Sequence, residues 1–207
     1  HYDKTDLNPL KLASVLVNGL LDEAIGWSYF SDGAVDNATG VGALIEIGRA
    51  FQRMNRAPRR TVVFVATTAE ERGLLGSEHF AAHPPPAVGR LVADVNLDMP
   101  LFLYPVGDLV AFGAEHSSLE RPAGRAGRTA RFALGPRPMP DGVIFVRSDQ
   151  YSFVERGVPS VYLMPGFTSR DPKVNGEAAF RGFLATHYHQ PSDEMTLPVD
   201  WPSGVRF

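Results

Sequence analysis

The stretch that decides the fold is "RRTVVFVATTAEERGLLGSEHF", residues 59–80. Its first part, residues 59–68, is β-branched and continuously apolar, a pattern typical of a central strand covered on both faces. Two adjacent carboxylates, Glu70 and Glu71, follow directly after this apolar run. Residues 76–83 then predict a short helix, which ends at three consecutive prolines. The stretch therefore predicts a buried strand, an acidic turn and a helix.

The rest of the chain continues this alternation of helices and strands. A helix is predicted over residues 37–55, where apolar residues recur at helical spacing. Further buried strands are predicted over residues 90–99, 108–113 and 158–164, and a helix in the first half of residues 117–142. Strands that alternate with helices indicate an α/β fold with a largely parallel sheet and helices on both faces. In such sheets, ligands bind beyond the carboxyl ends of the strands.

Composition narrows the function classes. The 207 residues suit one α/β domain, and the formal net charge of −3 gives no case for nucleic acid or an anionic membrane as partner. No apolar stretch is long enough to span a membrane. The chain has no cysteine, so any metal site must be built from His, Asp and Glu.

Acidic residues and histidines occupy positions where predicted elements begin or end. The carboxylates are Asp36, Glu70, Glu71 and Asp98, and the histidines near the two ends of the chain are His1, His187 and His189. Each has an ordinary structural interpretation: an aspartate before a helix is usually a cap, one after a strand usually a turn residue, and paired glutamates usually a solvated face. Their combination in one chain favours a metal site.

At this point the chain resembles the co-catalytic dizinc aminopeptidases of the bacterial leucyl aminopeptidase and aminopeptidase Y type. The matching pieces follow the family's order: "HYD" (1–3), "GAVDNATGVGALIEIGRAF" (33–51), residues 59–80, "NLDM" (96–99), "RSDQYSFVERGVPSVYL" (147–163) and "YHQPSDE" (188–194). The resemblance implies a zinc exopeptidase fold, a mixed, mainly parallel sheet sandwiched between helices. It also implies two Zn²⁺ ions per chain.

The resemblance also implies a role for individual residues. Asp36 would bridge the two zinc ions and Glu70 would be the general base. His1 and Asp98 would complete one zinc site, and Glu71 and His189 the other. Asp3 would hold the imidazole of His1, and the peptide bond between Asp36 and Asn37 would be cis.

These residue types suit the chemistry. Zinc accepts imidazole nitrogen and carboxylate oxygen and keeps a position open for water in catalytic sites. Two zinc ions about 3.5–4 Å apart can share a carboxylate and polarise a carbonyl group. Because neighbouring residues of an extended chain point in opposite directions, we expect Glu71 to face the metal and Glu70 the substrate.

The chain departs from the family pattern in the segment around Ser148. Gln150 stands where relatives often have His, and Phe145 lies near the place where some relatives carry a tyrosine that stabilises the oxyanion. A phenyl ring has no hydrogen-bond donor, so Tyr151 and Tyr188 are the candidates for oxyanion or substrate contacts.

The resulting prediction is a zinc-dependent aminopeptidase that hydrolyses N-terminal residues from peptides. By resemblance it is extracellular or periplasmic. Residues 1–207 would form a single catalytic domain, a fragment that lacks the family's N-terminal strands and last helix. Alternatives are a glutaminyl cyclase, a carboxypeptidase with Arg147 or Arg170 in its pocket, and a non-catalytic binding module. The sequence predicts no oligomeric state.

Overall fold

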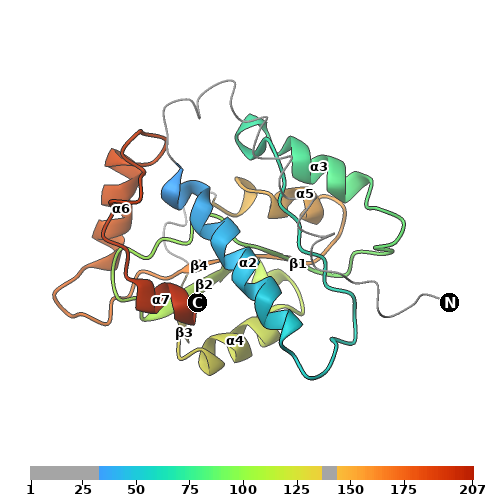
Figure 1. Ribbon diagram of the computed structural model, residues 1–207, viewed down its shortest axis with the longest axis horizontal. Coiled ribbons are helices and arrows are strands. Elements are labelled where there is room, and N and C mark those ends of the chain that lie inside the picture. Colours follow the sequence, from blue (N-terminus) through green and yellow to red (C-terminus); the bar gives the residue numbers. More distant parts are fainter. Residues whose placement is uncertain (1–32, 137–143) are drawn as a thin grey trace.

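The computed structural model describes residues 33–136 and 144–207 (Figure 1). The helices are α2 (Thr39–Gln52), α3 (Leu75–Ala82), α4 (Glu120–Thr129), α5 (Gln150–Val154), α6 (Gly176–Thr186) and α7 (Trp201–Arg206). The strands are β1 (Asp94–Asn96), β2 (Asp108–Phe112), β3 (Ala133–Leu134) and β4 (Ser160–Pro165). Short helical turns cover Ala34–Ala38, Glu70–Arg72, Ala114–His116 and Ile144–Val146.

The four strands form one sheet in the order β1-β4-β2-β3. The pairs β1–β4 and β2–β3 are parallel, whereas β2 and β4 run antiparallel. The predicted mixed, mainly parallel sheet is therefore confirmed.

Alternate side chains of the central strands pack on opposite faces of the sheet. In β2, Val110 and Phe112 pack in one cluster with Phe180 and Phe183 of α6. Ala111, between them in the chain, packs with residues at the start of α4. This period of two buries both faces of the strand, so the sheet lies between helices, as its continuous apolar sequence predicted. In Figure 1, α4 lies on the opposite side of the sheet from α3 and α5.

Most predicted elements are present, with shifted ends. The predictions over residues 37–55, 76–83, 108–113 and 158–164 correspond to α2, α3, β2 and β4. The helix predicted in the first half of residues 117–142 is α4. The strand predicted over residues 90–99 is much shorter, since only β1 makes ladder hydrogen bonds.

The central strand predicted over residues 59–68 is wrong for the described structure. This stretch forms no ladder with any other segment in residues 33–136 and 144–207. Its Phe64 ring instead packs edge-on against Phe51 of α2, at a centroid distance of 5.7 Å. An apolar run becomes a strand only where another backbone pairs with it, and among the described residues β1 pairs with β4 and not with this stretch.

Candidate metal centre

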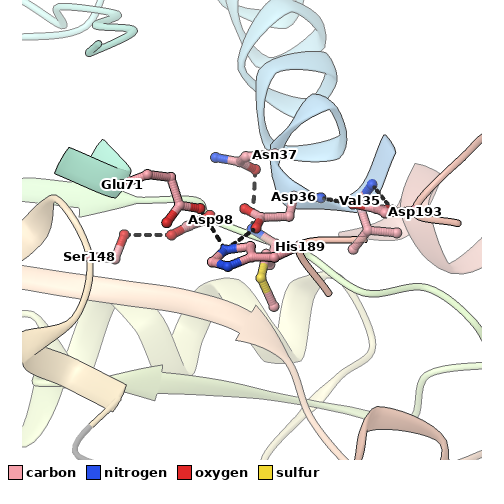
Figure 2. Close-up of polar contacts among 9 residues, drawn as sticks. Val35, Asp36, Asn37, Glu71, Asp98, Ser148, His189 and Asp193 are labelled. Carbon is pink, nitrogen blue, oxygen red and sulfur yellow. Dashed lines mark hydrogen bonds and ion pairs between the residues drawn. The ribbon is translucent and has the colours of Figure 1, made fainter. Parts of the chain in front are cut away.

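Three of the predicted metal ligands come together in space. Asp36, Glu71 and His189 each offer one ligand atom, and these atoms all lie within 4.8 Å of one another. His189 Nε2 is 3.2 Å from Asp36 Oδ2 and 2.7 Å from Glu71 Oε1 (Figure 2). Donors around one zinc ion, each about 2.0–2.2 Å from it, lie roughly 3–4 Å apart. The three side chains therefore fit a zinc ion by donor type, and their donor atoms lie close to the spacing that one ion requires.

Asn37 ties the turn that carries Asp36 to the segment that carries Asp98. Its side-chain Nδ2 donates to the carbonyl of Leu97, and its Oδ1 accepts from the amide of Met99, the residues on either side of Asp98. The bond between Asp36 and Asn37 is cis, which confirms that detail of the resemblance. Two carboxylates 62 residues apart are thereby held beside each other (Figure 2).

Gly40 allows this close approach. It lies in the first turn of α2, and a β-carbon there would stand 2.6 Å from the Leu97 carbonyl oxygen and 2.2 Å from Asn37 Oδ1. Any larger residue would push α2 away from the Asp98 segment. The glycine in "DNATG" therefore has a spatial reason that the sequence pattern did not reveal.

Asp98 lies next to the three-residue group without joining it (Figure 2). Its Oδ2 accepts a hydrogen bond of 2.6 Å from Ser148 Oγ, and its carbonyl accepts from Tyr162. Asn96 donates to Ser148 Oγ at 2.8 Å and so orients that hydroxyl. Burial raises the pKa of Asp98 to about 6, although the Ser148 hydrogen bond opposes the shift.

Glu70 and Glu71 share a single helical turn, Glu70–Arg72, rather than an extended end of a strand. The expectation that extended backbone points them in opposite directions is therefore wrong, since such a turn separates neighbouring side chains by roughly 120°. The outcome still differs for the two residues. Glu71 is 47% exposed and contacts His189, whereas Glu70 is the more buried of the two.

Glu70 lies within reach of several negative charges. Burial is the main cause that raises its pKa to about 9, followed by the charges of Asp98, Glu71, Asp149 and Asp36. A carboxyl group with such a pKa holds a proton at neutral pH in the absence of a cation. Glu70 therefore lies in a partly buried, acidic environment and not in that of a solvated surface residue.

Two further carboxylates in this acidic region, which the sequence analysis did not single out, are partly buried. Asp149 accepts a hydrogen bond from Thr67 Oγ1, while its Oδ1 and the Oδ2 of Asp94 are buried and have no hydrogen-bond partner among the residues that the structure describes. Burial, then the charge of Asp149, raises the pKa of Asp94 to about 7. Ser148 and Asp149 lie in the segment "RSDQYSF" and Asp193 in "YHQPSDE", so the motifs contained them, but no spacing assigned them a role.

These shifts predict how the stability of the metal-free protein depends on pH. The pKa values of Glu70, Asp94 and Asp98 are raised in the folded state, so this state retains protons that the unfolded chain releases above a pH of about 4–4.5. The contribution of these three carboxyl groups to the free energy of unfolding is fully present below that pH and is lost as pH rises toward about 9. We expect the midpoint of thermal unfolding of the metal-free protein to fall over this range. The Glu70→Gln variant, which carries no titrating group there, should show a shallower fall, and an unchanged slope would contradict the assignment.

The two candidate tyrosines differ in position. The Tyr188 ring stacks on the His189 ring at a centroid distance of 3.7 Å. Burial, then the charges of Asp36 and Glu71, raises the pKa of Tyr188, so its hydroxyl stays protonated and can donate a hydrogen bond. Tyr151 makes no side-chain hydrogen bond or ring contact with the described residues of this group. Phe145 packs against the core beside Gly113.

Two other predicted residues, His1 and Asp3, lie outside the described residues, so their positions stay predictions. Gln150, which stands where relatives often have His, is fully buried and bonds Asn96 and the Phe145 carbonyl. Arg170 donates to the Val106 carbonyl and lies over the Phe132 ring, so its guanidinium is already engaged. Within residues 33–136 and 144–207, no helix has the length and apolar character to cross a membrane.

Comparison with known proteins gives relatives by sequence and by fold. A probable zinc metalloprotease of Pyrenophora tritici-repentis is 35% identical over 99 residues, 48% of this chain and 19% of that protein. A solved zinc aminopeptidase from Bacillus subtilis matches at a TM-score of 0.57 and 23% identity, over 86% of this chain and 41% of that chain. A glutaminyl cyclase from Porphyromonas gingivalis matches at a TM-score of 0.54 and 18% identity, over 85% and 60%.

The two structural likenesses establish the fold, and the chain spans only about a fifth of the length of the fungal relative. A match over nearly the whole chain decides the family. The profile that describes peptidase family M28 matches residues 1–206, which include every motif of the candidate site. This chain belongs to peptidase family M28.

Proposed function

We propose that this protein is a zinc-dependent exopeptidase that releases N-terminal residues from peptides. The observation that carries the proposal is the meeting of Asp36, Glu71 and His189 within 4.8 Å, beside the half-buried carboxyl group of Glu70. These residues come from three distant parts of the chain, and ordinary packing gives no reason to gather two carboxylates and an imidazole. The peptidase family is in keeping with a hydrolytic role for them.

Asp36, Glu71 and His189 would hold one zinc ion. Asp98, whose segment Asn37 ties to the Asp36 turn, would hold a second together with His1, whose imidazole Asp3 would orient. Bound zinc polarises a carbonyl group and lowers the pKa of water to near neutrality. The count of two ions rests on the resemblance, because three of the four proposed ligands within the described residues form the close group and His1 lies outside them.

Glu70 would carry the proton transfers. Its carboxylate accepts a proton from the attacking water, whose oxygen bonds to the scissile carbonyl carbon. When the C–N bond breaks, Glu70 returns that proton to the leaving amine. Burial, and then the charges of four other carboxylates, raise the proton affinity of Glu70 in the metal-free protein. Bound zinc would offset those charges and leave the carboxylate of Glu70 able to accept the proton.

Tyr188 is our candidate for stabilising the oxyanion. Its protonated hydroxyl belongs to a ring that stacks on His189 and is electrostatically coupled to the carboxylates of the centre. Phe145, near the position where some relatives carry the tyrosine, has no donor. Tyr151 stays a weaker candidate for a substrate contact, because no contact links its side chain to the centre within the described residues.

A glutaminyl cyclase is the second candidate function, favoured by the structural likeness to the Porphyromonas gingivalis cyclase. The family resemblance implies one working zinc ion for a cyclase and two for an aminopeptidase. A carboxypeptidase would have to rely on the exposed Arg147, because Arg170 is engaged with Val106 and Phe132. A binding module would not need the buried environment of Glu70.

The extracellular or periplasmic location is also part of the proposal.

The test combines metal content with substrate choice. We expect the full-length protein to bind two zinc ions and to cleave peptides with a free N-terminus, while N-acetylated peptides of the same sequence resist cleavage. One zinc ion with cyclisation of N-terminal glutamine would select the cyclase instead. Cleavage of N-acetylated peptides from the carboxyl end would select the carboxypeptidase, and a protein that binds no zinc would refute the proposed function.

A further inference from the structure

Asp193 is the buried residue that connects two of the proposed ligands. Its side chain is fully buried, and each carboxylate oxygen accepts one main-chain amide: Oδ1 from Val35 at 2.8 Å and Oδ2 from Asp36 at 3.0 Å (Figure 2). Its own carbonyl accepts the amide of Ala34 at 3.1 Å. The amides of three successive residues in the turn before α2 therefore donate to one residue that lies 157–159 positions further along the chain.

The same residue belongs to the loop that carries His189. Hydrogen bonds tie that loop together: the Asp193 amide donates to the Gln190 carbonyl at 3.0 Å, and His187 Nδ1 lies 2.9 Å from Ser192 Oγ. His189 itself has a backbone φ of 57°, in the left-handed region that a histidine rarely adopts without support. The loop thus places His189 and Asp193 at a fixed separation, with Asp193 bound to the backbone of Asp36.

We infer that Asp193 is a positioning residue of the metal centre, which holds Asp36 and His189 at the separation that one zinc ion requires. This inference rests on the proposed zinc site. Asp193 acts through the main-chain amides of Val35 and Asp36 rather than through the donor atoms. Outer hydrogen bonds of this kind hold ligands in place before the metal arrives, and their loss typically costs about 10–100-fold in metal affinity.

The chemistry requires a carboxylate at this position. Two amide donors converge on the side chain, and an aspartate offers an acceptor to each. Asparagine has the same shape but only one acceptor oxygen, so its NH₂ group would face an N–H donor. Alanine would leave both amides without a partner in a buried place.

The experiment measures zinc affinity of the metal-free full-length protein by competition with a chromophoric chelator, at a temperature where every variant is folded. We expect Asp193→Asn to weaken zinc binding about 10–100-fold and Asp193→Ala to weaken it at least as much. Ser203→Ala is the matched control: Ser203 is also fully buried and accepts a distant main-chain amide, that of Val106 at 2.8 Å. This control should lose stability and keep the zinc affinity of the unmodified protein.

The outcomes separate this inference from the proposed function. If the unmodified protein binds no zinc, the proposed function fails. If it binds zinc and folded Asp193→Asn binds equally well, or Ser203→Ala loses as much affinity, the role of Asp193 is refuted.

Should the Asp193 variants not fold, hydrogen exchange in the unmodified protein decides. We expect the amides of Val35 and Asp36 to be protected without zinc, because the acceptors are part of the fold. Exchange at the rate of an open loop until zinc is added would overturn the inference.

Discussion

Replacing Glu70 by glutamine is expected to lower kcat by about 10²–10⁴-fold, while the bound zinc remains. The amide has nearly the shape of the carboxyl group but cannot accept the proton of the attacking water. In the proposed mechanism Glu70 is the base and coordinates no zinc ion, so its replacement should leave the metal sites intact. Steady-state kinetics on an aminoacyl substrate, with metal analysis of the same sample, measures both quantities.

Glu71→Gln is the matched variant, since it makes the same substitution on the adjacent residue. Glu71 Oε1 lies 2.7 Å from His189 Nε2, so the neutral amide should weaken one metal site. Activity of Glu71→Gln should therefore recover partly when zinc is added in excess, whereas that of Glu70→Gln should not. The opposite pattern, metal lost from Glu70→Gln and kept by Glu71→Gln, would show that the two roles are reversed.

Removing the metal is expected to abolish hydrolysis, the other effect of comparable size. Without zinc the centre holds several carboxylates close together, and the pKa of Glu70 is about 9, so the proposed base would be protonated at neutral pH. The activation of water and the availability of Glu70 would thus be lost together.

The measurement is residual activity after dialysis against a chelator, followed by titration with zinc or cobalt. Activity should return as metal binds, and thermal unfolding should show that the metal-free protein remained folded. Calcium or magnesium serves as control, because these ions prefer more oxygen ligands than the group of Asp36, Glu71 and His189 provides. Undiminished activity in protein without zinc would refute the mechanism.

Local patterns predicted most of the fold. The apolar runs that became β2 and β4 and the helical spacing of α2 and α3 are visible in consecutive residues, because side-chain burial follows the period of each element. Residues 59–68 show the limit of that reasoning. Their composition is that of a central strand, but a strand is defined by its partner, and no described segment pairs with them.

The candidate site can be separated in the same way into features visible in the sequence and features that only the tertiary structure reveals. The sequence by itself determined which residue types stand at the ends of elements, that cysteine is absent, and, through the motifs, the order of Asp36, Glu71, Asp98 and His189 along the chain. Only the tertiary structure decided that Asp36, Glu71 and His189 share one small volume. It also showed that Asn37 and Asp193 hold the Asp36 turn from two sides. The reason is physical: hydrogen bonds between residues 62 and 157 positions apart depend on how the chain packs, which the spacing of residues along the sequence does not encode.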